Sequence, residues 1–177
     1  EQATIALING EVDWAGNFIP AIDRVFVGRD PENHHYWFPR TGGTIFFYMN
    51  TTKAPMDKID VRKAISLAIN REQIVNVAMY NYTIPAHPTA LADGLSPWRS
   101  PEATEMGDWV THDLERANSM LDSVGYPLGK DGFRRLPDGS VLSFDISIVS
   151  GWSDWIRAAQ VISQNLKLVG IKTRVKT

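Results

Sequence analysis

The sequence contains no cysteine, no long hydrophobic run and no excess of basic residues. The absence of cysteine excludes disulfide scaffolds, thiolate nucleophiles and cysteine-ligated zinc. Lysine and arginine number 18 against 20 aspartate and glutamate residues, and a net charge of −2 does not favour binding to nucleic acid phosphates. Apolar runs such as 45–49 are far shorter than the roughly 20 residues of a membrane-spanning helix. We therefore expect no nucleic acid partner and no transmembrane helix in this chain.

The residues that are present suffice for a sizeable core. The 177 residues are 44% apolar and include 6 Trp, 7 Phe and 5 Tyr. At about 150 residues per domain, this length predicts a single domain over residues 1–177. The chain begins with helical composition and ends in a strand-like alternation, so we expect a piece of a longer protein, truncated at both ends. Large aromatic side chains offer much contact area, and some of them are candidates for contact with a ligand.

Hydrophobic periodicity predicts an α/β fold, with a mixed sheet and flanking helices. The clearest pattern is a strand over 142–148, a helix over 155–169 that ends at Gly170, and a strand over 171–176. Such a β-α-β unit makes its two strands parallel, because the crossover is right-handed in nearly all proteins.

Other segments predict further elements. Asp60 is expected to cap one helix, and Asn70 with Gln73 forms a capping-box pattern at the start of the next. A strand over 44–50 is apolar on both faces and is expected to be buried from two sides. The remaining expected elements are a helix over 2–9, a strand over 11–14, a long loop over 80–110, a helix over 113–124 and a hairpin over 131–139.

The loop at 150–155 is the best candidate for a ligand-binding site. In open α/β sheets, ligands bind beyond the carboxyl ends of the strands, beside helix amino termini. Gly151 permits a tight turn, Ser153 is expected to cap the helix, and Trp155 is expected to begin its buried face. Trp152 lies off that face, so its ring either meets a ligand or folds over the surface of the domain.

The same loop contains no Lys or Arg from 150 to 155, so no fixed cation is expected there for a carboxylate or phosphate. A neutral, hydroxylated ligand with an apolar face suits an indole ring with the polar oxygens of Ser153 and Asp154. Carbohydrate fits this description, with Trp152 as the surface on which a sugar ring stacks.

No pattern in the sequence indicates catalysis, a metal site or a cofactor. His34 and His35 are adjacent and their side chains diverge, so they are read as solvated loop residues. Glu102 and Glu105 resemble a glycosidase pair only in spacing, because no neighbouring residue would raise the pKa of one of them. No nucleophile elbow and no phosphate-binding glycine loop are present. We therefore expect no catalytic residues, no metal ligands and no cofactor.

Five short segments, taken in their order and spacing, carry a family resemblance: 8–13, 47–50, 60–71, 121–126 and 168–171. Together they resemble the later lobe of family 5 extracellular solute-binding proteins, which deliver peptides, nickel or oligosaccharides to ABC importers. The resemblance implies one lobe of a type II periplasmic-binding-protein-like fold, in a two-lobed receptor that closes on its ligand. It places the likely hinge crossings near Val12 and Phe47.

The resemblance also implies a setting for the protein. Peptide-binding members commonly place an arginine in the turn that here reads 150–152, and this departure favours the oligosaccharide-binding branch. The candidate ligand-binding residues are Trp152, Ser153, Asp154, Trp14, Asn17 and Asn50. Expected partners are an oligosaccharide or peptide and the membrane subunits of an ABC importer. We expect a monomer in the periplasm or outside the cell, attached to a membrane only by an anchor outside this chain.

Three functions remain open at this point. The first is an oligosaccharide-binding lobe of a transport receptor, which works by closure rather than by chemistry. The second is a peptide- or dipeptide-binding lobe of the same family, and the third is a fragment of a glycoside hydrolase.

Overall fold

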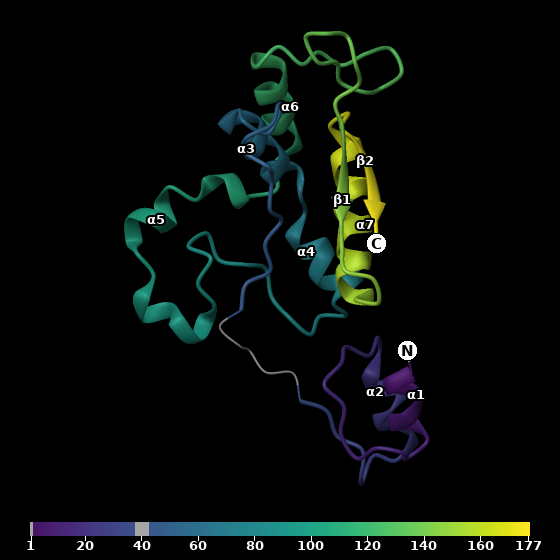
Figure 1. Ribbon diagram of the computed structural model, residues 1–177. Helices are drawn as coiled ribbons and strands as arrows, with labels where there is room; N and C mark the ends of the chain where they lie inside the picture. The colour runs from purple at the N-terminus through teal and green to yellow at the C-terminus, as the bar shows by residue number, and fades with distance from the viewer. Residues whose placement is uncertain (1, 38–42) are drawn as a thin grey trace.

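The computed structural model describes residues 2–37 and 43–177, and these form two bodies (Figure 1). Residues 2–37, called here the N-terminal unit, make up the small body at the bottom of Figure 1. Residues 43–177, the main body, contain the strands and the longer helices. Within the described residues no helix combines the length and the apolar character needed to cross a bilayer.

The N-terminal unit consists of two short helices and a turn around a small core. Helix α1 spans Gln2–Ile8 and ends before Gly10, whose positive φ of 71° favours glycine. Helix α2 spans Ile22–Val25 and is followed by the 3-10 turn η1, Val27–Arg29. The strand expected over 11–14 is wrong: these residues form no strand and are exposed, because no described strand lies beside them to pair with.

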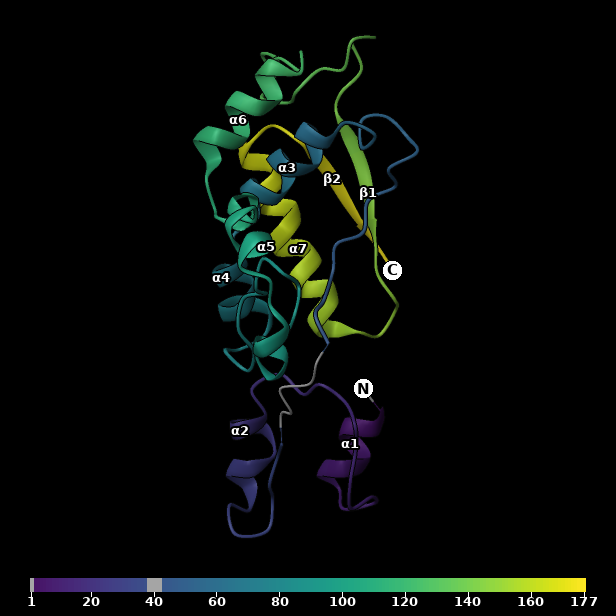
Figure 2. The ribbon, with the colours of Figure 1, turned by 90° about the vertical axis from the view of Figure 1, so that its left-hand side faces the viewer.

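The β-α-β unit of the main body is confirmed. Strand β1 (Ser143–Ser147) pairs in parallel with strand β2 (Lys172–Lys176), and Ile146 lies opposite Val175 in the register. Helix α7, Ser153–Leu168, makes the crossover and lies along one face of the strand pair (Figures 1 and 2). Gly170, with a φ of 77°, ends the turn that leads from the helix into β2. The chain is thus an α/β structure, as predicted.

Helices α3 (Ile59–Ala68) and α6 (Leu114–Ser123) pack against each other and complete the core. Asp113 caps α6 by accepting a hydrogen bond from the Arg116 N–H at 2.9 Å. The expected cap at Asp60 is wrong, because the N-cap of α3 is Lys58 and Asp60 lies inside the first turn. Apolar side chains from three helices and the strand ends fill this core: Val61, Ala64, Ile65, Leu67, Ala68, Ala117, Leu121, Leu142, Leu166 and Ile171.

The capping box at Asn70 is confirmed and contains one more residue than the sequence pattern shows. The Asn70 side chain accepts from the Gln73 N–H at 2.9 Å and begins α4 (Arg71–Gln73), which continues as the π-helix η2 (Ile74–Ala78). Asn165 of α7, buried in the core, accepts from the Asn70 N–H at 2.9 Å and donates to the Gln73 side chain at 2.7 Å. The cap therefore joins α4 to α7.

The long connection over 80–110 has the form expected, a series of short turns. It contains the 3-10 helix η3 (Asp93–Trp98), helix α5 (Pro101–Glu105) and the 3-10 turn η4 (Asp108–Val110). The hairpin expected over 131–139 is present as a pair of isolated antiparallel bridges, Leu128 with Arg134 and Arg135 with Val141.

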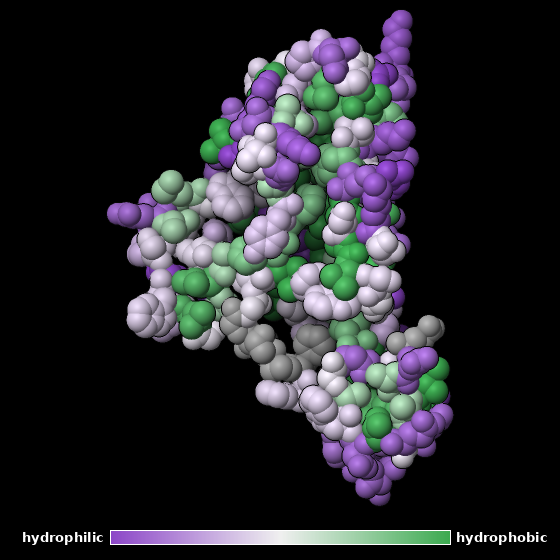
Figure 3. Space-filling model, in the orientation of Figure 1, coloured by the Kyte–Doolittle hydropathy of each residue, from purple (hydrophilic) through white to green (hydrophobic). Residues whose placement is uncertain are grey.

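Residues 44–50 are extended but form no strand, so the expectation of a strand buried on two sides is wrong. Phe47 and Met49 pack against the core, whereas Ile45, Phe46 and Tyr48 are 62%, 49% and 84% exposed. Figure 3 shows hydrophilic side chains over the two strands and apolar ones in the middle of this face. The segment buries one face only, since no described strand pairs with it or covers the other.

Candidate ligand-binding site

The turn between β1 and α7 follows from two local features of the chain. Gly151 has a φ of 86°, in the left-handed region that favours glycine. Trp152 occupies the N-cap position, where its carbonyl accepts the Ile156 N–H at 2.9 Å. This turn lies at the end of the main body that faces the N-terminal unit (Figures 1 and 2). The candidate site therefore lies where the two described bodies meet.

Two indole rings define the surface of this turn. The rings of Trp152 and Trp155 meet edge to face, with centroids 4.5 Å apart and planes at 86°. Trp152 keeps 47% of its surface exposed, so one side of its ring remains open to a ligand. Trp155 is only half-buried, and the expectation that it begins the buried face of the helix is wrong. The first turn of α7 extends beyond the core, and full burial begins at Ala159.

The polar residues of the turn are arranged differently from the expectation. Ser153 is the first helical residue and is exposed, so the prediction that it caps the helix is wrong; Trp152 takes that position without a side-chain bond. Asp154 is half-buried in the first turn, where the positive end of the helix dipole favours a carboxylate. No hydrogen bond occupies either side chain among the residues that the structure describes.

The remaining three candidates do not join this turn. Trp14 lies in the N-terminal unit and is 82% exposed, and the nearby Asn17 donates to the Thr4 hydroxyl at 3.0 Å. The Asn50 side chain accepts from the backbone and hydroxyl of Thr52 at 3.1 and 2.7 Å. The turn that Asn50 begins lies at the other end of the main body from the start of α7 (Figures 1 and 2).

Four aromatic rings connect the N-terminal unit to the main body, and we call them the tyrosine cluster: Phe18, Tyr36, Tyr80 and Tyr82. Their centroids lie 5.9 to 6.5 Å apart in the pairs that touch. The Tyr82 hydroxyl donates to Asp23 at 2.9 Å, and burial together with this bond raises the pKa of Tyr82. The cluster follows the π-helix η2, and Tyr80 and Asn81 have positive φ values of 51° and 62°. Strained backbone of this kind is common at functional sites.

Arg157 is the residue that the sequence analysis missed. It lies one turn into α7, on the side of the helix that carries Ser153. Its guanidinium carbon is 5.1 Å from the Tyr80 ring centroid, and its buried Nη1 has no hydrogen-bond partner. The expectation that no fixed cation serves this turn is therefore wrong. The helical spacing from Ser153 to Arg157 was the available signal, but the search stopped at residue 155.

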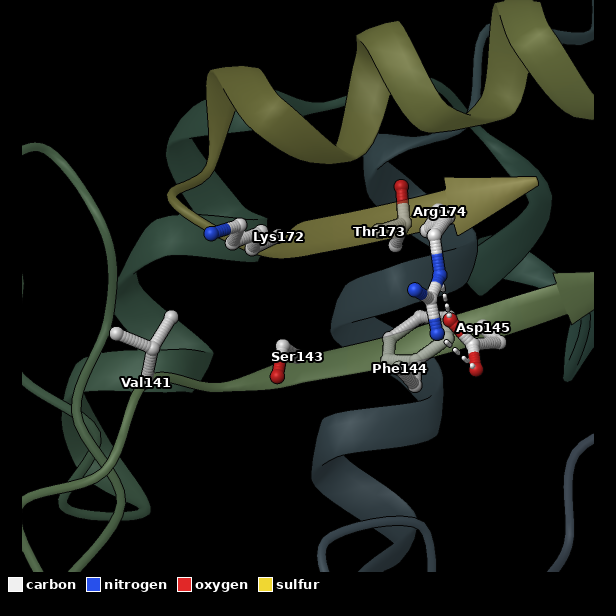
Figure 4. A pocket seen from close by; sticks show the side chains of 7 residues that line it. All are labelled: Val141, Ser143, Phe144, Asp145, Lys172, Thr173 and Arg174. Atoms are coloured by element: carbon white, nitrogen blue, oxygen red, sulfur yellow. Dashed lines mark hydrogen bonds and ion pairs between the residues drawn. The ribbon is translucent and has the colours of Figure 1, made fainter.

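Two hollows elsewhere are less suited to a solute. One, of about 420 Å³, lies over the strand pair, where Arg174 and Asp145 form an ion pair across its floor (Figure 4). A larger one, of about 610 Å³, lies between residues 44–49 and the loop that contains His87. No group of three or more His, Cys, Asp or Glu residues in the described ranges is arranged to hold a metal ion.

Known proteins share both the sequence and the fold. A glutathione-binding protein of Salmonella choleraesuis is 31% identical over 130 residues, and the nickel-binding periplasmic protein of Escherichia coli is 26% identical over 129. These matches cover 73% and 72% of this chain but only 22% and 23% of the relatives. The chain thus spans less than a quarter of the length of these relatives.

The structural comparison covers more of the chain. A mannohexaose-bound structure of a periplasmic oligopeptide-binding protein from Thermotoga maritima matches with a TM-score of 0.83 and 29% identity, over 99% of this chain and 33% of that one. A structure of an agropinic acid complex from Agrobacterium tumefaciens matches 72% of this chain and 23% of that one with a TM-score of 0.56 and 27% identity. The family profile described as bacterial extracellular solute-binding proteins, family 5 Middle, matches residues 1–177, and the chain therefore belongs to this family.

Proposed function

We propose that this chain is the ligand-binding lobe of a solute receptor for an ABC importer and that its solute is an oligosaccharide. The observation that carries the proposal is the likeness, over nearly the whole chain, to a protein whose structure contains mannohexaose. The half-exposed Trp152 ring, held edge-on by Trp155, supports it, because a flat indole face suits the apolar face of a sugar ring. Ser153 and Asp154 supply oxygens beside that ring for sugar hydroxyls.

The proposed mechanism is capture without a chemical step. Two lobes of the receptor close about a hinge and bury the solute between them, and the closed form is recognised by the membrane subunits of the importer. The crossings near Val12 and Phe47 flank the connection between the N-terminal unit and the main body, which suits a hinge. The receptor acts as a monomer outside the cytoplasmic membrane, and a lipid anchor outside this chain would hold it there.

A peptide is the second candidate solute, and two observations favour it. The glutathione-binding relatives bind a peptide, and their identity to this chain is similar to that of the mannohexaose-bound protein. Arg157 supplies a cation at the same turn, and a guanidinium matches a peptide carboxylate.

Calorimetric titration of the intact receptor separates these candidates. We expect mannohexaose or cellohexaose to bind with a Kd in the micromolar range or below, and glutathione and tetraalanine to bind at least about tenfold more weakly. Tighter binding of the peptides would replace the oligosaccharide with the peptide reading. Release of new reducing ends from the hexasaccharides would instead show that the protein is a hydrolase.

A further inference from the structure

Arg157 lies in an environment that does not satisfy its charge. Its side chain is half-buried, and its Nη1 is enclosed without a hydrogen-bond acceptor. No carboxylate forms an ion pair with it among the described residues, although Asp154 precedes it by three positions on the same helix. An arginine in the first turn also meets the positive end of the helix dipole, which disfavours a cation.

The contact with Tyr80 does not remove this cost. A guanidinium over an aromatic ring gains some electrostatic attraction, here at 5.1 Å from the centroid. The ring face accepts no conventional hydrogen bond, so the N–H groups of Nη1 stay unsatisfied. By contrast, the buried Arg134 donates to the carbonyl oxygens of Val169 and Tyr126 and to the Asp122 carboxylate. The chain thus satisfies its structural arginine and leaves Arg157 without an acceptor.

The surroundings of Arg157 are those of a binding position. The tyrosine cluster brings residues of the N-terminal unit to Tyr80, and Trp152 and Trp155 lie one turn earlier on α7. Figures 1 and 2 place this end of α7 toward the N-terminal unit. Because Arg157 keeps part of its surface exposed, a ligand reaches the guanidinium after side-chain shifts of the kind common at binding surfaces.

We propose that Arg157 is the charge-recognition residue of the solute site and that the bound solute presents a carboxylate to it. This inference rests on the proposed function and refines the solute class, from a neutral sugar to one that carries an acidic group. A carboxylate supplies two acceptor oxygens in the plane of the guanidinium and neutralises its charge. Such a group comes from a uronic acid residue of an oligosaccharide or from the C-terminus of a peptide, and both share this chemistry.

The test compares matched ligands that differ only in the carboxylate. The intact receptor is titrated with trigalacturonate and its methyl ester, and with tetraalanine and tetraalanine amide. We expect one of the free acids to bind at least about tenfold more tightly than its neutral partner. The pair that shows the difference identifies the source of the carboxylate. The ratio should fall to about one in Arg157→Gln and remain unchanged in Lys167→Gln, a control at the exposed far end of the same helix.

Thermal unfolding separates recognition from a structural role. We expect Arg157→Gln to melt at or above the temperature of the wild type, because the substitution removes a cation that has no partner. A clear decrease in melting temperature would make Arg157 a structural residue and would overturn the proposal.

Equal affinity for acid and neutral partner in both pairs would also overturn it. In that case binding of mannohexaose would leave the proposed receptor function intact. Failure of mannohexaose and all four probes to bind would contradict both the carboxylate proposal and the oligosaccharide or peptide receptor.

Discussion

Single residues in this chain have clearly different tasks, and Arg134 shows the structural one. Its side chain is 2% exposed and donates to three carbonyl oxygens, of Val169, Tyr126 and Asn118, as well as to Asp122. These bonds join the loop after α6 to the end of α7, so one guanidinium holds together elements that are distant in the sequence. A buried cation with this many partners is destabilising to remove, because its acceptors stay behind in a dry environment.

We expect Arg134→Leu to lower the free energy of unfolding by about 3 kcal/mol, since buried carbonyl oxygens lose their donors. Chemical denaturation of the wild type and the variant measures this difference. Asp122→Asn is the matched control: the Asp122 side chain is 61% exposed, and its loss should cost less than about 1 kcal/mol. Equal losses in the two variants would mean that the ion pair, rather than the carbonyl bonds, is what stabilises the site.

Trp152 and Trp155 should separate binding from stability. Trp152→Ala removes an indole face that is 47% exposed, so we expect affinity for mannohexaose to fall by about tenfold with little change in melting temperature. Trp155→Ala should cost about 1 to 2 kcal/mol of stability, less than for a fully buried tryptophan, because the ring is only half-buried. Calorimetry and melting curves on both variants test the assignment. Unchanged affinity in Trp152→Ala would remove Trp152 from the site.

At the scale of the elements, the predictable parts were those whose signals are local. The β-α-β unit, the cap at Asn70 and the end of α7 at Gly170 follow from spacing within a few residues. The strands expected over 11–14 and 44–50 failed because a strand needs a neighbour, and sequence propensity does not supply one. Asn165, which completes the cap at Asn70 from 95 residues away, had no signal in the sequence for the same reason.

The candidate site divides in the same way. Trp152 was expected off the buried face of α7 and is half-exposed there, because the alternation of strand and helix fixes the position of the loop. Its role in binding stays a prediction. Arg157 was missed since its importance depends on what surrounds it: the Tyr80 ring and the lack of an acceptor at Nη1 arise only when η2 packs against α7.

The strand pair should give the chain a measurable pH dependence. Asp145 lies opposite Arg174 in the register, and hydrogen bonds from Arg174 and Lys176 lower the pKa of Asp145 from 3.8 to about 2. A carboxyl whose pKa is lower in the folded state stabilises the fold above its unfolded pKa, and this contribution is lost as the pH falls through about 2. We expect the wild type to lose stability between pH 4 and pH 2 more steeply than Asp145→Asn.

Denaturation curves at several pH values between these limits test this expectation. Parallel pH profiles for the two proteins would show that the ion pairs of Asp145 persist too little in solution to affect folding. Asp138→Asn provides a comparison, because Asp138 accepts only from the Ser140 hydroxyl and backbone and forms no ion pair in the described structure.

At the scale of the whole molecule, the two bodies differ greatly in size. The core of the N-terminal unit contains three buried apolar residues, Leu7, Ile19 and Phe26, whereas the main body has one large continuous core. A unit this small does not bury enough surface to be stable alone. It is held to the main body through the tyrosine cluster and the bond from Tyr82 to Asp23.

We therefore expect the isolated chain to unfold in a single cooperative transition, as predicted for one domain over residues 1–177. Differential scanning calorimetry measures this directly, through agreement of the calorimetric and van't Hoff enthalpies. Two resolved transitions would show that the bodies fold independently. A gradual melt without a peak would show that the core requires parts of the receptor outside this chain.

The perpendicular contact between Trp152 and Trp155 gives the protein an optical reporter of its own. Two indoles with centroids 4.5 Å apart couple their electronic transitions, and such coupling produces a signed pair of bands in circular dichroism. The sign and size of these bands depend on the angle between the rings. A solute that stacks on Trp152 and turns its ring would change this signal, so capture can be followed in the unmodified receptor without a dye or a label.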